Sequence, residues 1–235
     1  MFQPVKIAFG QFLSGFYADI SPTTRALAEF KSRGFAQGFG WCPARTLDSI
    51  PEMLGYWQRH DQDKSTSPYQ LPVCLVGMDN NYIPTGRDYT RQIAGRQMVM
   101  LPDDPKERMF GLRAISADLN FRIAFFAAEE PTSRSLAAQF GLYIDLPARR
   151  TFEATYRFAG QDLLWPIQLQ STETPAMPGA TENKNMAIMV LDITLMAWIP
   201  VFDAPGDDEP NDGQGTTGDP DDPSGYPVVQ DIVRV

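Results

Sequence analysis

The 235-residue chain contains a single histidine and only two cysteines. No nucleophile-elbow sequence accompanies the histidine, His60, so a Ser-His-Asp site is not indicated. Cys42 and Cys74 are too far apart in sequence to form a zinc-binding motif, and reduced thiols are expected. A phosphate-binding loop and a dinucleotide fingerprint are also missing. The sequence therefore predicts a protein that is not an enzyme and that holds no cofactor and no metal.

Long apolar runs and a surplus of basic residues are missing as well. No run approaches the roughly 20 apolar residues of a membrane-spanning helix, and residues 1–6 lack the order of a signal peptide. Lys and Arg number 20 against 29 Asp and Glu, which gives a formal net charge of −9. Because the basic residues are scattered, no nucleic-acid-binding face is predicted. We expect a soluble, unsecreted protein without a membrane partner and without specific nucleic-acid binding.

Most of the negative charge lies in one segment, residues 203–225. It contains eight acidic residues, four prolines and five glycines, and neither Lys nor Arg. Such a composition cannot bury enough apolar surface to offset the entropy of ordering, so we predict a flexible acidic tether. Residues 1–202 then carry only about −1, and copies of this body would repel each other little. A solubilising role for the tether stays open.

The last ten residues, 226–235, are apolar and β-branched. Val228, Val229, Ile232 and Val233 favour a strand that pairs with the edge of a sheet. We therefore predict a C-terminal β-strand arm at the end of the tether, with these four side chains as candidate interface residues. Pairing with a neighbouring copy and folding back onto the chain's own sheet both stay open at this point.

Residues 1–65 predict a helical, aromatic-rich N-terminal region. The first helix is expected to bury an apolar face made of Phe9, Phe12, Leu13, Phe16 and Tyr17. Ser21 and Pro22 predict the start of a second helix that ends at Gly34, and Ser49 precedes a third that runs to about His60.

An aromatic loop interleaved with glycine, residues 34–41, is expected between the second and third helices. Its Phe35, Phe39 and Trp41 are candidate interface residues. The alternative is that these side chains cover the core, and the spacing does not decide between the two.

Residues 66–202 predict an α+β body with a mainly antiparallel sheet. Strands are expected at residues 71–78, 97–101, 113–128, 151–158, 163–169 and 186–202. One prominent packed helix is expected before the fourth of these strands, with an apolar face of Leu136, Phe140, Tyr143 and Ile144.

Two of these strands, residues 113–128 and 186–202, are unusually long. At about 3.3 Å per residue each would extend roughly 50 Å, past the core of a single domain. Either each contains a break or bulge, or their ends pair with neighbouring copies. Asp192, inside the second strand, is expected to face solvent or to pair with a residue of the next strand.

Four stretches of the body, residues 119–128, 129–132, 150–152 and 162–166, together resemble structural proteins of tailed-phage virions. The family is the tail-terminator and neck class, whose members cap the tail tube where it meets the head. The resemblance implies an α+β fold, assembly as rings that are commonly hexamers, and no catalytic residues.

We therefore expect a ring-forming tail terminator or neck component that joins the tail tube or sheath to the head. Its expected place is the virion, assembled in the host cytoplasm. Its expected partners are copies of itself, with a hexamer favoured, and other virion tail or neck proteins. The alternative is a non-enzymatic intracellular adaptor that docks a partner through the C-terminal strand. A hydrolase with a site assembled from dispersed residues is a third hypothesis.

Overall fold

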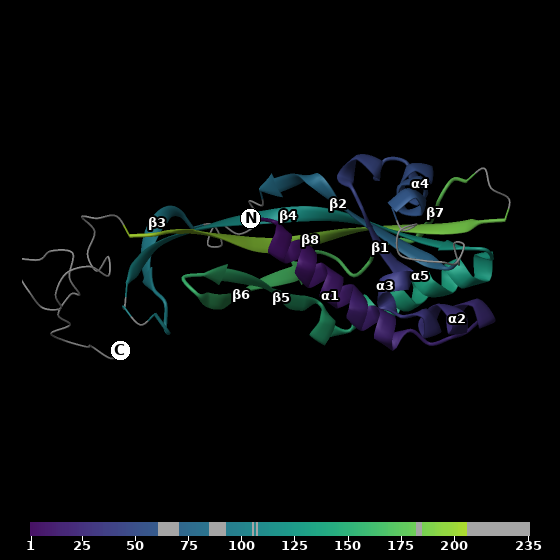
Figure 1. The fold of residues 1–235 in the computed structure, drawn as a ribbon, viewed down its shortest axis with the longest axis horizontal. Helices are drawn as coiled ribbons and strands as arrows, with labels where there is room; N and C mark the ends of the chain where they lie inside the picture. Colours follow the sequence, from purple (N-terminus) through teal and green to yellow (C-terminus); the bar gives the residue numbers. More distant parts are fainter. Residues whose placement is uncertain (61–70, 85–92, 105, 107, 182–184, 206–235) are drawn as a thin grey trace, which may run out of the picture.

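In the computed structural model the chain forms a mixed α and β fold around one mainly antiparallel sheet, which confirms this level of the predicted fold class (Figure 1). The structure describes residues 1–60, 71–84, 93–104, 106, 108–181 and 185–205. The helices are α1 (Gln3–Asp19), α2 (Arg25–Arg33), α3 (Phe35–Gly38), α4 (Ile50–His60) and α5 (Glu130–Asp145). The strands are β1 (Phe39–Cys42), β2 (Val73–Pro84), β3 (Ile93–Met100), β4 (Met109–Ala127), β5 (Thr151–Phe158), β6 (Gln161–Leu169), β7 (Met177–Pro178) and β8 (Ala187–Asp203).

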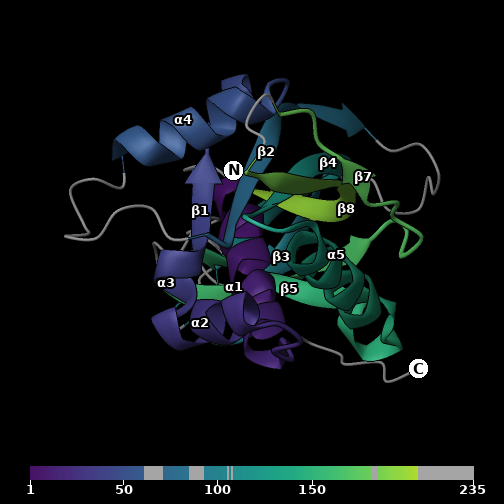
Figure 2. The ribbon, with the colours of Figure 1, turned by 90° about the vertical axis from the view of Figure 1, so that its right-hand side faces the viewer.

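The sheet has the strand order β1-β2-β4-β8-β6-β5 and curls around α1 (Figure 2). On the central strand β4, the ring of Phe121 lies 4.6 Å from that of Phe9. On β5, at one edge, the ring of Phe152 stacks on Phe12 at 4.9 Å. On β1, at the other edge, the indole of Trp41 lies close to Gly10 of the helix. One helix therefore contacts both edges and the centre of the sheet.

Helix α5 lies beside α1 on the same face of the sheet. The ring of Phe140 is 5.0 Å from that of Phe16 on α1 and 6.2 Å from that of Phe125 on β4. The apolar faces predicted for both helices are confirmed, because every one of their members is at most 9% exposed. Two facing helices thus fill the concave side of the sheet.

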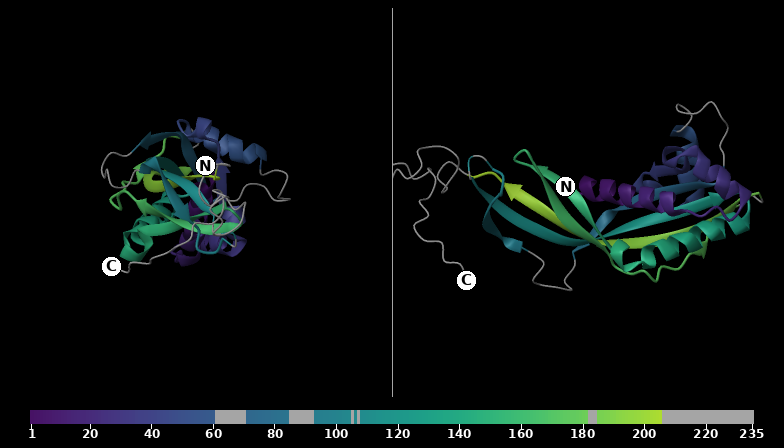
Figure 3. Two further views of the ribbon diagram at one scale, coloured as in Figure 1. Left: turned by 90° about the vertical axis from the view of Figure 1, so that its left-hand side faces the viewer. Right: turned by 90° about the horizontal axis from the view of Figure 1, so that it is seen from below.

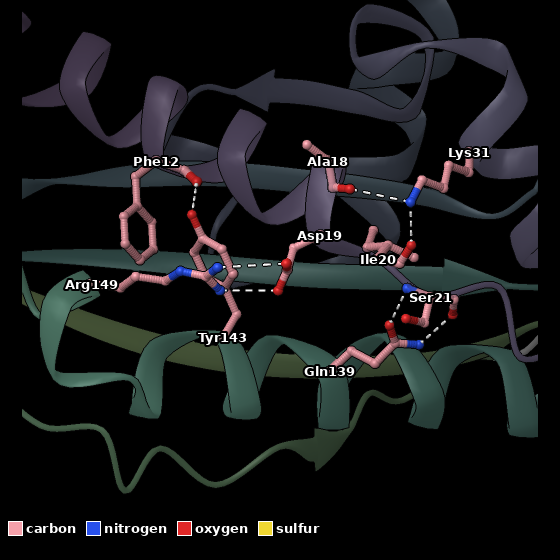
Figure 4. A network of polar contacts seen from close by, with 9 residues as sticks. All are labelled: Phe12, Ala18, Asp19, Ile20, Ser21, Lys31, Gln139, Tyr143 and Arg149. Atoms are coloured by element: carbon pink, nitrogen blue, oxygen red, sulfur yellow. Dashed lines mark hydrogen bonds and ion pairs between the residues drawn. The ribbon is translucent and has the colours of Figure 1, made fainter.

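Polar contacts fix the C-terminal end of α1 to α5 and to the turn that follows α5 (Figure 4). The Arg149 guanidinium donates to the Asp19 carboxylate at 3.0 Å. The side-chain amide of Gln139 accepts from the Ser21 backbone N–H at 2.7 Å and donates to the Ser21 carbonyl at 2.9 Å. Tyr143 donates from its hydroxyl to a carbonyl of α1 at 3.3 Å. These contacts set the position of α1 along its axis.

The start of the second helix differs from the prediction at Ser21. Helix α2 begins at Arg25, and its cap is Thr24, whose hydroxyl accepts from the Leu27 N–H at 3.2 Å. The reason is that Gln139 already engages both backbone groups of Ser21. The end at Gly34 is confirmed, and this glycine has a φ of 90°.

Residues 34–41 were predicted to form a loop, and this is wrong. They form the helical turn α3 and most of β1, which pairs parallel to β2 in the register Phe39–Cys74 to Cys42–Gly77. Because β1 is a strand of the common sheet, the boundary expected at residue 65 does not separate two packing units.

The long strands β4 and β8 pair residue by residue from Gly111–Asp203 to Ala127–Ala187 without a register shift. The break or bulge considered for these strands is therefore wrong. The irregularities lie instead in β2 and β3, on the other side of β4. An unbroken pair of this length forms the long axis of the molecule (Figure 1).

Helix α4 covers the opposite face of the sheet near one end of these strands (Figure 1). Met53 of α4 is fully buried in a second apolar cluster that also contains Ala124 and Phe126 of β4 and Ile188 of β8. In β4, Leu119, Phe121, Ile123 and Phe125 belong to the apolar cluster that contains α1 and α5, and strict alternation would leave the residues between and after them exposed. Residues 124 and 126 depart from it because α4 packs on them.

Past the helices, β3 and the adjoining ends of β4 and β8 project as a three-stranded arm (Figures 1 and 3). We define the arm as β3 with residues 109–114 and 200–203. Asp203, expected as the first residue of the tether, is the last residue of β8, where it pairs with Gly111 and accepts from Arg113 at 3.2 Å.

The β5–β6 hairpin diverges from β8 beside the arm (Figure 3). Strand β6 pairs with β8 only through residues 167–169 and 195–197. Pro166 directly precedes this ladder in β6, and Pro200 lies just past it in β8. Proline has no N–H to contribute to a ladder, which explains why the two strands separate there.

The hairpin turn is formed by Ala159 and Gly160, which have φ values of 49° and 83°. Positive φ at both central residues is the mark of a type I′ turn. Glycine adopts this conformation without penalty, whereas alanine at positive φ is strained by its Cβ. The turn therefore carries strain at one position.

We predict that Ala159→Asn stabilises the protein by about 0.5–1 kcal/mol, because asparagine tolerates positive φ better than alanine. Gly160→Ala is the matched control and should destabilise by about 1 kcal/mol through the backbone alone, because no atom lies within 4 Å of a Cβ at this position. Urea unfolding monitored by tryptophan fluorescence measures both. A loss of stability in Ala159→Asn would contradict the turn assignment.

Candidate interaction surface

The predicted interface residues Phe35 and Phe39 lie together at the C-terminal end of α1. Their rings stack at 4.7 Å, and both lie edge-on to the ring of Tyr17, at 5.9 and 6.0 Å. The Tyr17 hydroxyl is 2.8 Å from the carbonyl of Phe30 and accepts from the Gly34 N–H at 2.9 Å. Both interface candidates are half-buried. They cover the core with one side and leave the other exposed.

The third candidate, Trp41, is half-buried on β1 and faces the N-terminal half of α1. The Lys6 ammonium lies 4.7 Å above its ring, in the geometry of a cation–π contact. Ile7, one residue further along α1, is 54% exposed. Trp41 thus belongs to a surface that continues onto the helix.

A shallow groove of about 420 Å³ runs between α1 and these aromatic side chains. We call it the α1 groove; its walls include Gln3, Lys6, Ile7, Gly10, Phe35 and Trp41. A second cavity of about 460 Å³ shares Gln3 and Lys6 with it and continues to the loop at Arg45. Lys6 and Arg45 outnumber the one carboxylate in this cavity, Asp79, so this side of the groove carries a small net positive charge. The combination is suited to an apolar contact bordered by acidic groups.

Asp192 forms a cross-strand ion pair, as the sequence predicted. It lies directly opposite Arg122, which donates to both carboxylate oxygens at 2.7 and 2.9 Å and also to the carbonyl of Leu47. The hydrogen bond to Asp192 raises the pKa of Arg122, and the nearby Asp48 and Asp79 act in the same direction. The Arg122–Asp192 pair thus links β4 and β8 to the turn before α4. This structural role explains why a carboxylate lies in the apolar strand β8.

The two cysteines are buried, and burial disfavours their reactive thiolate form. Burial raises the pKa of Cys42 to about 11, and that of Cys74 is raised well above its usual value for the same reason. The Cys42 thiol lies 3.6 Å from the carbonyl of Met53. Because the thiolate is the nucleophilic form, neither side chain is prepared for catalysis.

Other functional groups are sparse in the described part of the chain. Its Asp, Glu, Cys and His residues form no cluster of three or more that could hold a metal ion. None of its helices is both long and apolar enough to cross a membrane. His60 ends α4, but its side chain is outside the described residues, as are the candidates Val228, Val229, Ile232 and Val233.

No protein-family model and no curated protein matches this chain.

Ile7 was not predicted from the sequence as an interface residue. Its signal was present, because Ile7 is an apolar residue outside the predicted apolar face of the first helix. The full extent of β3 was not predicted either, since only residues 97–101 were expected as a strand and β3 begins at Ile93. The residues before 97 give little apolar alternation, and they are mostly exposed.

We predict that Ile7→Lys weakens self-association at least about tenfold without changing the unfolding midpoint, because an exposed lysine in an apolar contact must lose its hydration. Ile83→Lys is a matched control, since Ile83 is also 54% exposed and lies outside the α1 groove. Sedimentation velocity over a range of concentrations measures the change. Equal self-association of the two variants would remove the groove as a contact surface.

Proposed function

We propose that this protein is a ring-forming structural component of a tailed-phage virion, a tail terminator or neck protein between the tail tube or sheath and the head. Copies of the chain form a closed ring, with six copies favoured, and other virion proteins contact it above and below. The C-terminal segment 226–235 is a strand on a flexible acidic tether, and it joins neighbouring copies. Assembly takes place in the host cytoplasm.

The observation that carries this proposal is the three-stranded arm formed by β3 and the adjoining ends of β4 and β8. Strands β4 and β8 continue past the helices, so their ends contribute little to the helix-covered core. Within one chain these ends are held by a small apolar cluster, in which Phe110 is buried and both Phe110 and Phe202 contact Phe158 of the β5–β6 hairpin. Ordering the backbone costs roughly 1–2 kcal/mol per residue. Contacts with a second copy offset that cost.

Surface composition supports association between copies. Residues 206–235 contain eight of the 29 acidic residues and one of the 20 basic ones, so residues 1–205 carry a formal charge of only −2. Exposed apolar side chains lie on several elements, including Ile7 on α1, Met100 on β3, Leu142 on α5 and Leu164 on β6. Low net charge and exposed apolar area both favour self-association.

The catalytic alternative has little support among the described residues. Their two thiols are buried, and burial raises the pKa of both. Their one conspicuous carboxylate in an apolar strand, Asp192, is bound to Arg122. A structural role requires none of these groups to react.

We predict that the purified full-length protein forms a discrete oligomer, with a mass six times that of the 26.3-kDa chain. Multi-angle light scattering gives the mass, and negative-stain electron microscopy should show closed rings. Deleting residues 226–235 should abolish the oligomer and leave the melting temperature of the monomer unchanged.

A compact monomer at all concentrations and salt conditions would contradict the ring and favour the adaptor hypothesis. A sharply lower melting temperature after the deletion would mean that the segment belongs to the fold of its own chain.

We also predict that His60→Ala and Cys42→Ser leave oligomer formation and virion assembly unchanged, because no chemical step depends on either side chain. The Cys42 variant serves as a test of the buried thiol, with Cys74→Ser as its counterpart. Complementation of a phage lacking the protein provides the readout. A folded His60→Ala protein that fails to complement would revive the hydrolase hypothesis.

A further inference from the structure

Strand edges that lack a hydrogen-bonded neighbour are the places where another strand can add. Within the described residues, such edges occur on β1, on β2 past Gly77, on β3, on β5, on β7 and on the separated ends of β6 and β8. Strand β7 has only two residues, and the free part of β2 is irregular between Met78 and Tyr82 and ends at Pro84, so neither offers a regular edge. The sheet therefore offers several possible acceptors, and their local chemistry distinguishes them.

The separated ends of β6 and β8 are poor acceptors. Pro166 interrupts the free edge of β6, and Pro200 that of β8, so each edge lacks one donor. Side chains also occupy the space between them, since the Trp165 ring lies 6.3 Å from that of Trp198 and 6.4 Å from that of Phe202.

The outer strands β1 and β5 are poor acceptors for other reasons. Strand β1 spans only Phe39–Cys42, half the length of β3, and the Trp57 side chain of α4 lies against its Gly40. Strand β5 lies along α1, with Phe152 stacked on Phe12 and with Asp19 bound to Arg149 at the turn before β5. A further strand beside β5 would meet the helix.

Strand β3 has none of these obstacles. It spans Ile93–Met100, contains neither proline nor lysine, and pairs with β4 on one side only. Met98 and Met100 are 38% and 55% exposed and offer apolar contacts. Natural edge strands are usually shortened or carry prolines, charges or bulges that prevent pairing. The regular part of β3, residues 97–100, lacks such protection.

The charge of Arg96 is directed away from this edge. Its guanidinium crosses Gly111, where the absence of a Cβ leaves room for it, and lies 3.9 Å from the Asp203 carboxylate. Arg113 donates to the same carboxylate. The only charged side chain of β3 thus binds across the arm, and residues 97–100 at the outer edge carry no charge.

The C-terminal segment can reach this edge. Asp203 pairs with Gly111, which pairs with Met98, so the end of β8 is two strand spacings from β3, about 10 Å. A flexible chain of the length of residues 204–226 has a root-mean-square span of about 25–30 Å. The β3 edge of the same copy is within that span, and an adjacent copy is reached where its β3 edge lies within about 25–30 Å of the end of β8.

We propose that residues 227–235 of an adjacent copy add as a strand to the outer edge of β3. The inference rests on the proposed ring and names the surface that closes it. Backbone hydrogen bonds supply the affinity, and apolar side chains on one face of the donated strand, such as Val233 and Val235, pack on Met98 and Met100. Each copy donates one strand and accepts one, so the contact is heterologous, which is the type of contact that forms a ring when the rotation between copies closes.

Cysteine pairs in separate chains test the assignment. One chain carries Met98→Cys, and a series of second chains carries a single cysteine at each position from 228 to 233. After mixing and mild oxidation with oxidised glutathione, disulfide-linked dimers should form at alternate positions only, because strand side chains alternate between faces. Cys42 and Cys74 should stay silent, since both are buried. Leu164→Cys on the β6 edge is the control acceptor and should give at least about tenfold less product.

Three results decide the matter. Alternating links between separate chains support the proposal. Links that form only when both cysteines are in one chain, in a protein that remains monomeric, assign the β3 edge correctly but overturn the adjacent copy as donor and contradict the proposed ring. No link above the Leu164 control in a protein that does form rings overturns the β3 assignment and leaves the ring intact.

Hydrogen exchange provides a measurement without substitutions. Deleting residues 226–235 should accelerate amide exchange in residues 97–100 at least about tenfold, because the outward N–H groups lose their partners. Exchange in β6 should not change. Equal exchange of β3 in the two proteins would overturn the proposal even if a cysteine variant misfolds.

Discussion

The fold depends on the burial of α1 in the concave face of the curled sheet. Phe9, Phe12 and Phe16 reach β4, β5 and α5 from one side of a single helix. Removing a buried phenylalanine ring costs about 3–5 kcal/mol, a large part of the stability of a domain. The fit is close enough that a Cβ at Gly15 would lie 2.5 Å from the Tyr143 hydroxyl. Without α1, the two edges of the sheet would have nothing to curl around.

Much of this architecture could be predicted from local patterns. The helical spacing from Phe9 to Tyr17 and from Leu136 to Ile144 gave the buried faces of α1 and α5, and the alternation in residues 151–158 gave β5. These patterns are local because one face of each element is buried and the other exposed. They do not say which elements meet, so the position of α1 between β1 and β5 could not be derived from them.

The errors have long-range causes. Residues 39–42 contain a glycine between two aromatic residues and show no alternation, and β1 forms because β2, far along the chain, provides a parallel partner. Ala124 and Phe126 are buried because α4 packs on a face that the alternation marked as exposed. The candidate interface residues show the same division between local patterns and long-range packing. Phe35 and Trp41 were found by composition, whereas Ile7 joins them only through the packing of α1 against β1.

The unbroken β4–β8 pair also has a mechanical consequence. Its hydrogen bonds lie perpendicular to the strands, so a force that pulls the two strands along their length in opposite directions loads all of them together. A pair loaded in this way resists far more force than one that opens bond by bond from an end. The molecule is therefore stiff along its long axis and transmits a pull from the arm to the helix-covered end with little extension.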